Sequence, residues 1–351
     1  MLRPLAGLTI IEFEGIGPGP LAGRMLADHG AEVTAIVRPS KATLGNPDAL
    51  SDDPLRRGKR IVALDLKASE AVEEALRLIA GADALIEGNR PGVMERLGLG
   101  PAECALRNPK LVYGRMTGWG QEGPLAQAAG HDLNYVALTG ALSLTERRGA
   151  APVVPPTVLG DAGGALGLAF GIVSGVLSAR ATGRGCVVDA AILDMVAALS
   201  GIALWARATG MLDGGRPSIF HDSPFYDAYL CADDRYVTIG ALEPQFYAAL
   251  LEKLGLADLD PKAQYNTRQW PALKARFRAL FMSRPSAEWR ALLEGTDVCF
   301  APVLNLAEAA AHPHNAARGL YRADADGRLD AAEAPRFQPL AVPAPRSRGE
   351  G

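Results

Sequence analysis

The chain has 351 residues, of which 48% are hydrophobic and 21% are charged, so it can bury a large core, and this composition argues against disorder. That length is long for one domain and comfortable for two. A net charge of −3 at pH 7 and a pI near 6.0 argue against a general nucleic-acid binder.

The first half of the chain alternates predicted strands and helices. Helices are expected from the loop over residues 15–20 through Asp28 and over residues 69–80. Strands are expected over residues 8–13, 32–37, 61–66, 83–87 and 110–116. Strands joined by crossover helices predict a doubly wound, Rossmann-like parallel sheet with helices on both faces. We therefore expect a large α/β domain over residues 1–190.

A nearly uncharged stretch over residues 162–179 carries glycines at four-residue spacing. On a helix, Gly163, Gly167, Gly171 and Gly175 form one stripe. Each glycine costs about 0.8–1 kcal/mol relative to alanine, so the stripe indicates close approach of another helix or of a ligand backbone. We interpret the stretch as a buried helix in a close helix pair rather than as a membrane span.

The second half of the chain has a different pattern of predicted elements. A helix over residues 193–209 precedes a predicted hairpin over residues 226–240, whose turn lacks the usual glycine. Further helices are expected over residues 245–254, 270–282 and 286–294. We expect a linker helix and loop over 191–222, a small α+β domain over 223–312, and a C-terminal segment over 313–351 that returns to the large domain.

The loop over residues 15–20 follows a strand and opens a helix, as a dinucleotide-binding fingerprint does. Its last position is Pro20, and two prolines remove N–H donors that would hold a pyrophosphate, so a nicotinamide site is disfavoured. Arg38 follows the second strand, the position at which such folds bind the ribose of a nucleotide, and arginine can pair with a ribose phosphate. An ordinary solvated arginine remains the alternative.

Three short stretches place ionisable side chains beside glycine or proline, where the backbone turns sharply: residues 130–132, 160–161 and 242–245. Together they supply one imidazole and three carboxylates, with no nearby Cys/His spacing for a metal, so no metal site is expected. Such groups can move a proton at carbon without a cofactor. Taken singly, each has a structural alternative, such as helix capping by an aspartate.

Four cysteines lie far apart in the sequence, at positions 104, 186, 231 and 299. This spacing is typical of reduced thiols rather than of a disulfide framework. The apolar run near the N-terminus is short and is interpreted as a strand, so no signal peptide is expected. A cytoplasmic protein is the expectation.

Several of these stretches resemble the α-methylacyl-CoA racemases, a branch of the class III CoA-transferase family, which includes the formyl-CoA transferases. The resemblance runs in order over about residues 4–340 and rests on residues 14–20, 86–98, 115–121, 129–135, 160–161 and 239–247. His131 favours the racemase branch, because the residue before the nucleophilic aspartate of the transferases is usually not histidine. Glu243 lies where the racemases resemble one another in having a glutamate.

The resemblance implies epimerisation of 2-methylacyl-CoA thioesters by 1,1-proton transfer at the α-carbon, with His131 and Asp161 as opposing bases. Glu243 would orient the His131 ring and favour its protonated form. A mismatch of about ten pK units between the α-proton and the base costs ~14 kcal/mol. A general base supplies only about 3–5 kcal/mol, so the enolate oxygen must be stabilised. The start of the helix near Asp132 could provide the N–H donors.

For CoA itself, the resemblance points to Arg38, Lys59 and Arg90 as partners of the phosphates. CoA is part of the substrate, so no separate cofactor is expected. The family's fold is an interlocked homodimer in which each chain threads through a hole in its partner. The expected partners are thus an acyl-CoA and a second copy, with neither nucleic acid nor membrane.

Three alternatives remain open. The nearest is a CoA-transferase of the same family that uses Asp132 as the nucleophile and forms mixed anhydrides. The second is a silent acyl-CoA-binding protein, which would be expected to lack at least one of His131, Asp161 and Glu243. The third is a nucleotide-dependent oxidoreductase, which Pro20 disfavours. The acyl group itself cannot be read from the residues.

Overall fold

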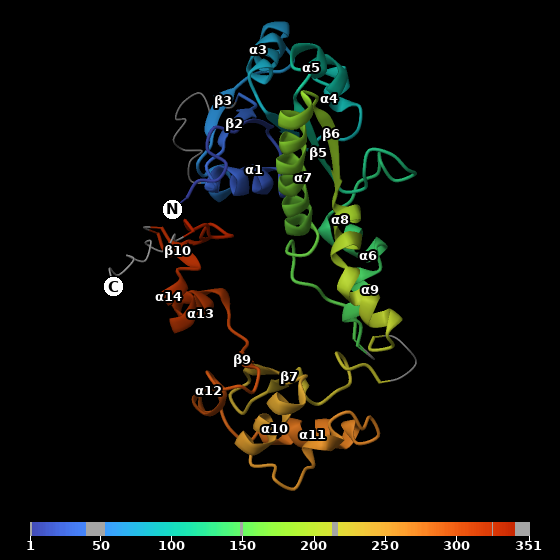
Figure 1. The fold of residues 1–351 in the computed structure, drawn as a ribbon, viewed down its shortest axis with the longest axis vertical. Helices are drawn as coiled ribbons and strands as arrows, with labels where there is room; N and C mark the ends of the chain where they lie inside the picture. The colour runs from blue at the N-terminus through green and yellow to red at the C-terminus, as the bar shows by residue number, and fades with distance from the viewer. Residues whose placement is uncertain (1, 40–52, 148–149, 213–216, 325, 341–351) are drawn as a thin grey trace, which may run out of the picture. The chain divides into compact units, whose positions relative to one another are not determined.

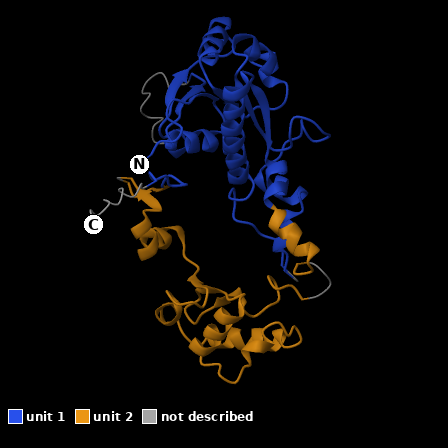
Figure 2. Ribbon diagram, viewed as in Figure 1, with its two compact units in different colours: residues 1–199, 332–351 blue, residues 200–331 orange. Residues whose placement is uncertain are grey.

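The structure is a computed structural model that describes residues 2–39, 53–147, 150–212, 217–324 and 326–340. The chain divides into two compact units (Figure 2): unit 1 comprises residues 1–199 and 332–351, and unit 2 comprises residues 200–331. The domain limits expected from the sequence stay predictions, and the last residues of the expected C-terminal segment, 341–351, lie outside the described residues.

Unit 1 is built on a six-stranded sheet in the order β3-β2-β1-β4-β5-β6 (Figure 1). Every neighbouring pair is parallel. The strands are β1 (Thr9–Phe13), β2 (Glu32–Val37), β3 (Arg60–Ala63), β4 (Ala84–Glu87), β5 (Val112–Thr117) and β6 (Cys186–Ala191). This is the strand order of the Rossmann fold, so the predicted doubly wound sheet is confirmed.

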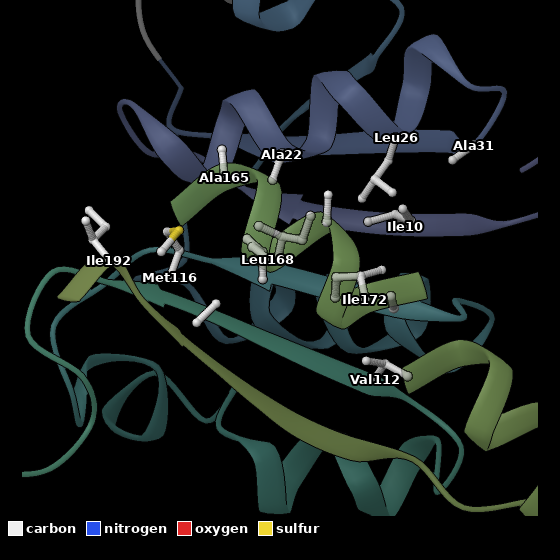
Figure 3. Close-up of a cluster of buried hydrophobic side chains, with 14 of the residues drawn as sticks. Ile10, Ala22, Leu26, Ala31, Val112, Met116, Ala165, Leu168, Ile172 and Ile192 are labelled. Atoms are coloured by element: carbon white, nitrogen blue, oxygen red, sulfur yellow. The ribbon is translucent and has the colours of Figure 1, made fainter. Parts of the chain in front are cut away.

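Helices cover both faces of this sheet. They are α1 (Pro18–Asp28), α3 (Ser69–Ala80), α4 (Val93–Arg96), α5 (Pro101–Arg107), α6 (Asp132–Leu138), α7 (Asp161–Thr182) and α8 (Ile192–Leu199). Residues of α1 and α7 share one buried cluster with strand residues such as Ile10 and Val112 (Figure 3). Residues of α3, α4 and α5 share another cluster with Ile11 and Tyr113. Neighbouring strand residues thus point to opposite faces, as pleating requires.

Two expectations for the sheet were incomplete. The third strand ends at Ala63 rather than at Leu66, and β6 was not predicted as a strand. β6 pairs only with β5 at the edge of the sheet, and its first four residues are exposed or half-buried. An edge strand of this kind is specified by its pairing partner more than by its own hydrophobic pattern.

The glycine stripe of α7 meets neighbouring side chains at close range. A Cβ at Gly167 would overlap Met195 of α8, and a Cβ at Gly171 would overlap Val188 of β6. The expected close approach is confirmed, although the neighbours are a strand as well as a helix. By length and composition α7 is the one described helix that could cross a membrane, but it packs on α1, β5 and β6 with 56% of its apolar window buried.

Unit 2 contains a three-stranded antiparallel sheet in the order β7-β8-β9. Its elements are α9 (Gly201–Ala208), β7 (Tyr226–Leu230), β8 (Tyr236–Gly240), α10 (Pro244–Lys253), α11 (Trp270–Phe281), α12 (Ser286–Leu293), β9 (Phe300–Pro302), α13 (Leu306–Ala311), α14 (Pro313–Arg318), β10 (Tyr321–Ala323) and β11 (Leu329–Ala331). An aromatic core joins β7 to α11 and α12 through residues such as Tyr229, Phe281 and Trp289.

The hairpin and the three helices that the sequence predicts are present, whereas β9, α13, α14, β10 and β11 were not predicted. The hairpin turn places Asp234 at a φ of 58°, the left-handed conformation that a glycine would usually provide. The single helix expected over residues 193–209 is wrong in one respect, because the structure divides it into α8 and α9 at Ser200.

Candidate active site

A cavity of about 560 Å³ opens at the carboxyl ends of the strands in unit 1. The strand order reverses between β1 and β4, and in doubly wound folds ligands bind in the crevice at that point. The loops that follow β1, β4 and β5 line the cavity, as do the residues that join them: residues 13, 15–20, 86, 88–91, 116–119, 126, 128–131, 135, 161 and 192. His131, Asp161 and Arg90 are among them.

His131 immediately precedes α6 and has an extended backbone, with φ −135° and ψ 173°. Its side chain is exposed and lines the cavity. Its backbone N–H donates to Oδ1 of Asn134 at 3.0 Å, and its carbonyl oxygen accepts from the N–H of Asn134 at 2.8 Å. The first turn of α6 therefore holds the backbone of His131 and leaves the imidazole toward the cavity.

Asp161 is the first residue of α7 and is half-buried in the wall of the same cavity. Burial raises the pKa of its carboxyl group, the negative charge of Asp132 raises it further, and His131 opposes the shift. A carboxyl group with a raised pKa holds a proton closer to neutral pH, which suits an acid–base catalyst.

Asp132 is buried and does not line the cavity. Its Oδ1 accepts the backbone N–H of Asp161 at 2.8 Å, and its Oδ2 accepts that of Thr157 at 3.2 Å. A Cβ at Gly160 would overlap this carboxylate, so glycine is needed there for the close approach. Asp132 thus joins the start of α6, where His131 lies, to the start of α7, where Asp161 lies.

Glu243 belongs to unit 2 and caps the start of α10, where its carbonyl oxygen accepts the N–H of Tyr247 at 3.0 Å. Its side chain is exposed. The expected hydrogen bond between Glu243 and His131 stays a prediction.

The three residues expected at the CoA phosphates lie in different surroundings. Arg90 is exposed and lines the cavity. Arg38 is exposed just after β2, and its backbone N–H donates to Oε2 of Glu14 at 3.0 Å. Because both arginines are exposed, either could contact a phosphate, and this contact stays a prediction.

Lys59 lies in a different environment from the two arginines. Its ammonium donates to both carboxylate oxygens of Glu12, at 2.6 and 2.8 Å, and to the carbonyl oxygen of Pro20 at 2.8 Å. The side chain has no exposed surface. All three of its donors are used inside unit 1, which disfavours Lys59 as a phosphate ligand, and the contact expected from the sequence stays a prediction.

Two aromatic residues of the cavity wall received no role from the sequence. Trp119 and Tyr135 pack edge to face, with ring centroids 4.6 Å apart and an interplanar angle of 84°. The spacing of His131 and Tyr135, four residues apart at the start of a helix, is a signal that could have linked them, since such residues share a helix face. Over the described ranges, no group of three or more His, Cys, Asp or Glu side chains is placed to hold a metal ion.

Comparison with known proteins places these observations in a family. The model of CoA-transferase family III matches residues 5–347. An alpha-methylacyl-CoA racemase of Mus musculus is 41% identical over 332 residues, which cover 92% of this chain and 83% of that protein. The Homo sapiens protein of the same name is 39% identical over 327 residues, covering 90% and 82%. A crystal structure of a CAIB/BAIF family protein from Brucella suis matches with a TM-score of 0.80 and 27% identity, covering 96% and 93% of the two chains.

Proposed function

The chain belongs to CoA-transferase family III, and from that premise we propose that it is an isomerase that epimerises 2-methylacyl-CoA thioesters. A proton leaves the α-carbon and another returns to the opposite face of the same carbon, through an enolate. His131 and Asp161 act as the two opposing bases. Relatives that are 41% and 39% identical over most of the chain carry the name of this activity.

One observation carries the proposal: His131 and Asp161 line one cavity at the switch point of the sheet. They start two different helices, α6 and α7, and Asp132 ties these helix starts together through the N–H of Asp161. Two bases that start different helices can address a carbon from two directions, which racemisation requires.

The residues divide the proton transfer between them. In one direction neutral His131 takes the α-proton, and a protonated Asp161 donates a proton to the opposite face of the α-carbon. In the reverse direction an ionised Asp161 takes the proton and the imidazolium returns one. Burial and the charge of Asp132 raise the pKa of Asp161, which brings its two protonation states closer to balance near neutral pH. Main-chain N–H groups at the start of α6 stabilise the enolate oxygen.

The alternative within the family is CoA transfer with Asp132 as the nucleophile. Both oxygens of Asp132 accept main-chain N–H bonds, and the residue lies outside the cavity lining. Each oxygen keeps a second lone pair, but attack on a thioester in the cavity would require this buried carboxylate to move into the cavity. This favours a positioning role for Asp132 and, with it, the racemase over the transferase.

The substrate is held through its CoA part, with Arg90 and Arg38 as partners of the phosphates, because guanidinium groups pair with phosphate in a bidentate manner. CoA enters as part of the substrate and no separate cofactor takes part. Glu243 orients His131. The working form is an interlocked homodimer in the cytoplasm.

The test is incubation with a panel of 2-methylacyl-CoA thioesters in deuterated water, without any acceptor acid. Deuterium at the α-carbon, together with loss of optical purity, supports the proposal. Turnover that requires an added acceptor acid would instead identify a transferase. Binding of the thioesters without exchange or transfer would identify a silent acyl-CoA-binding protein.

A further inference from the structure

The peptide group between Gly130 and His131 is held at both of its polar ends by side chains of the helix that follows. Its carbonyl oxygen accepts a hydrogen bond from the hydroxyl group of Tyr135. Its N–H donates to Oδ1 of Asn134 at 3.0 Å. A peptide unit is planar, so fixing both ends fixes the orientation of the whole plane.

The ring of Tyr135 is itself confined. A Cβ at either Gly118 or Gly130 would crowd the ring, and the ring packs edge to face on Trp119 at 4.6 Å. Gly118 and Trp119 follow β5, whereas Tyr135 comes from α6. The hydroxyl group therefore reaches Gly130 from a ring that the end of the sheet holds in place. Burial raises the pKa of this phenol, which keeps it a neutral donor.

The plane of this peptide sets where the imidazole of His131 lies, because it fixes one side of the Cα of His131. On its other side the carbonyl of His131 accepts from the N–H of Asn134, and also from that of Tyr135 at 3.3 Å. What remains free is the rotation of the side chain itself. A shift of about 1 Å in a catalytic group can cost on the order of 100-fold in rate.

We infer that Tyr135 and Asn134 are positioning residues for His131, which hold the Gly130–His131 peptide plane so that the imidazole addresses one face of the α-carbon. The inference rests on the proposed proton transfer. It adds that two neutral side chains of α6 orient His131, whereas Asp161 is held by Asp132 and by its place at the start of α7.

The variant that tests this is Tyr135→Phe, which keeps the ring and removes the hydroxyl donor. Tyr113→Phe is the matched control, because the Tyr113 hydroxyl donates to the Leu99 carbonyl at 2.8 Å in the core on the other face of the sheet. Deuterium exchange at the α-carbon is measured for each epimer separately. For Tyr135→Phe we expect the epimer that presents its proton to His131 to exchange about 10- to 100-fold more slowly, and the other epimer to be little affected. Tyr113→Phe should leave both rates unchanged.

Double variants separate positioning from general damage. Adding Tyr135→Phe to Asp161→Asn should slow the remaining exchange by the same factor, whereas adding it to His131→Ala should change nothing further. Equal slowing of both epimers with a lowered thermal midpoint, or no slowing of either, overturns the inference. Asn134→Ala should follow Tyr135→Phe in pattern.

One readout does not depend on the proposed activity. Amide hydrogen exchange of the segment over residues 128–135, followed by mass spectrometry, should be faster in Tyr135→Phe than in wild type and unchanged in Tyr113→Phe. If wild type exchanges no α-proton but this amide result holds, the proposed function fails and the structural part of the inference stands. If wild type exchanges α-protons and the amides are unaffected by Tyr135→Phe, the inference alone fails.

Discussion

The loop over residues 15–20 borders two groups of ionisable side chains that differ in how completely their charges are satisfied. Beneath it, Lys59 uses all three donors on Glu12 and Pro20, and neither charged side chain is more than 4% exposed. Beside it, His131 and Asp161 line the cavity, and the carboxylate of Asp161 receives no hydrogen bond from another described residue. The first group completes the fold, and the second is left for a substrate.

The two groups differ in how their charges are buried and paired, and not in the types of residue that they contain. Moving a charge into the interior costs several kcal/mol unless it is fully paired, so a buried pair such as Glu12–Lys59 is complete or absent. A half-buried carboxyl group without a partner, such as Asp161, instead adapts by a raised pKa, and such groups concentrate at functional sites. Each prediction below tests whether the two groups divide in this way.

The largest effect is expected in the unsatisfied group. His131→Ala and Asp161→Asn should each lower epimerisation by about 10²–10⁴-fold, the usual contribution of a general acid or base. His131 is exposed, so its loss should change the free energy of unfolding by no more than about 0.5 kcal/mol. Chiral analysis of the product and denaturant titration measure the two effects. His314→Ala, at an exposed position in unit 2, is the control for both; near-normal activity of a folded His131→Ala variant would remove His131 from the mechanism.

The buried Glu12–Lys59 pair should behave in the opposite way, because its loss should mainly lower stability. Lys59→Met leaves Glu12 buried without its partner and should lower the free energy of unfolding by about 3–5 kcal/mol. Burial already raises the pKa of Glu12 to about 7 with the ammonium beside it, so the carboxyl group is expected to take up a proton in the variant. Thermal or urea unfolding measures the loss, and Lys67→Met, on the surface, should show almost none.

A second replacement sharpens this result. Adding Glu12→Leu to Lys59→Met removes the orphaned carboxyl group and should restore much of the stability, because an apolar pair can replace a buried ion pair. Loss of CoA affinity in a Lys59→Met variant of unchanged stability would instead return Lys59 to the phosphate site.

A smaller effect is expected at the two exposed arginines. Arg90→Ala and Arg38→Ala should each raise the KM for acyl-CoA on the order of 10- to 100-fold, as loss of a charged hydrogen bond worth about 1.5–3 kcal/mol implies. kcat should change little, because the phosphate contacts are the same in the ground state and the transition state. Comparison of CoA with dephospho-CoA thioesters identifies which arginine meets the 3′-phosphate. Arg107→Ala, on the surface of α5, is the control, and unchanged KM in both variants would refute the assignment.

The smallest effect is expected at Asp132, whose buried carboxylate accepts the main-chain N–H groups of Thr157 and Asp161. Asp132→Asn removes a negative charge that helps to raise the pKa of Asp161, so that pKa should fall. Asp161 must be ionised to act as a base, and the acid limb of the pH–rate profile should therefore move to lower pH. Weakening the cap on α7 should cost about 0.5–2 kcal/mol of stability. An unmoved acid limb contradicts the positioning role, and complete loss of activity would favour Asp132 as a nucleophile.

Much of the fold follows from hydrophobic periodicity. The strand over residues 32–37 and the helix over residues 69–80 have in the structure the limits that the sequence predicts. What was missed depends on neighbours: β6 forms because β5 offers a partner, and the break at Ser200 separates α8 in unit 1 from α9 in unit 2. A local pattern holds little information about such partners.

The same limit applies to the site. His131 and Asp161 were predicted from motifs, and the structure brings them to one cavity. From the sequence, Lys59 and Arg90 are both candidate cations for the phosphates. Only the structure shows that Lys59 is buried in an ion pair with Glu12 and that Arg90 is exposed. The bond from Tyr135 to Gly130 could not be predicted from the residues alone, since it requires the ring to fit between two glycines near opposite ends of one loop, residues 118–131.

The most direct test of the two-base claim is α-proton exchange in deuterated water, resolved by epimer, for Asp161→Asn and His131→Ala. Asp161→Asn keeps the side-chain volume and removes one base, so exchange should persist for the epimer that presents its proton to His131 and fall for its mirror partner. His131→Ala should show the opposite preference, and both variants should lose epimerisation in both directions. Equal exchange of both epimers in both variants would contradict the account and point to a single mobile base.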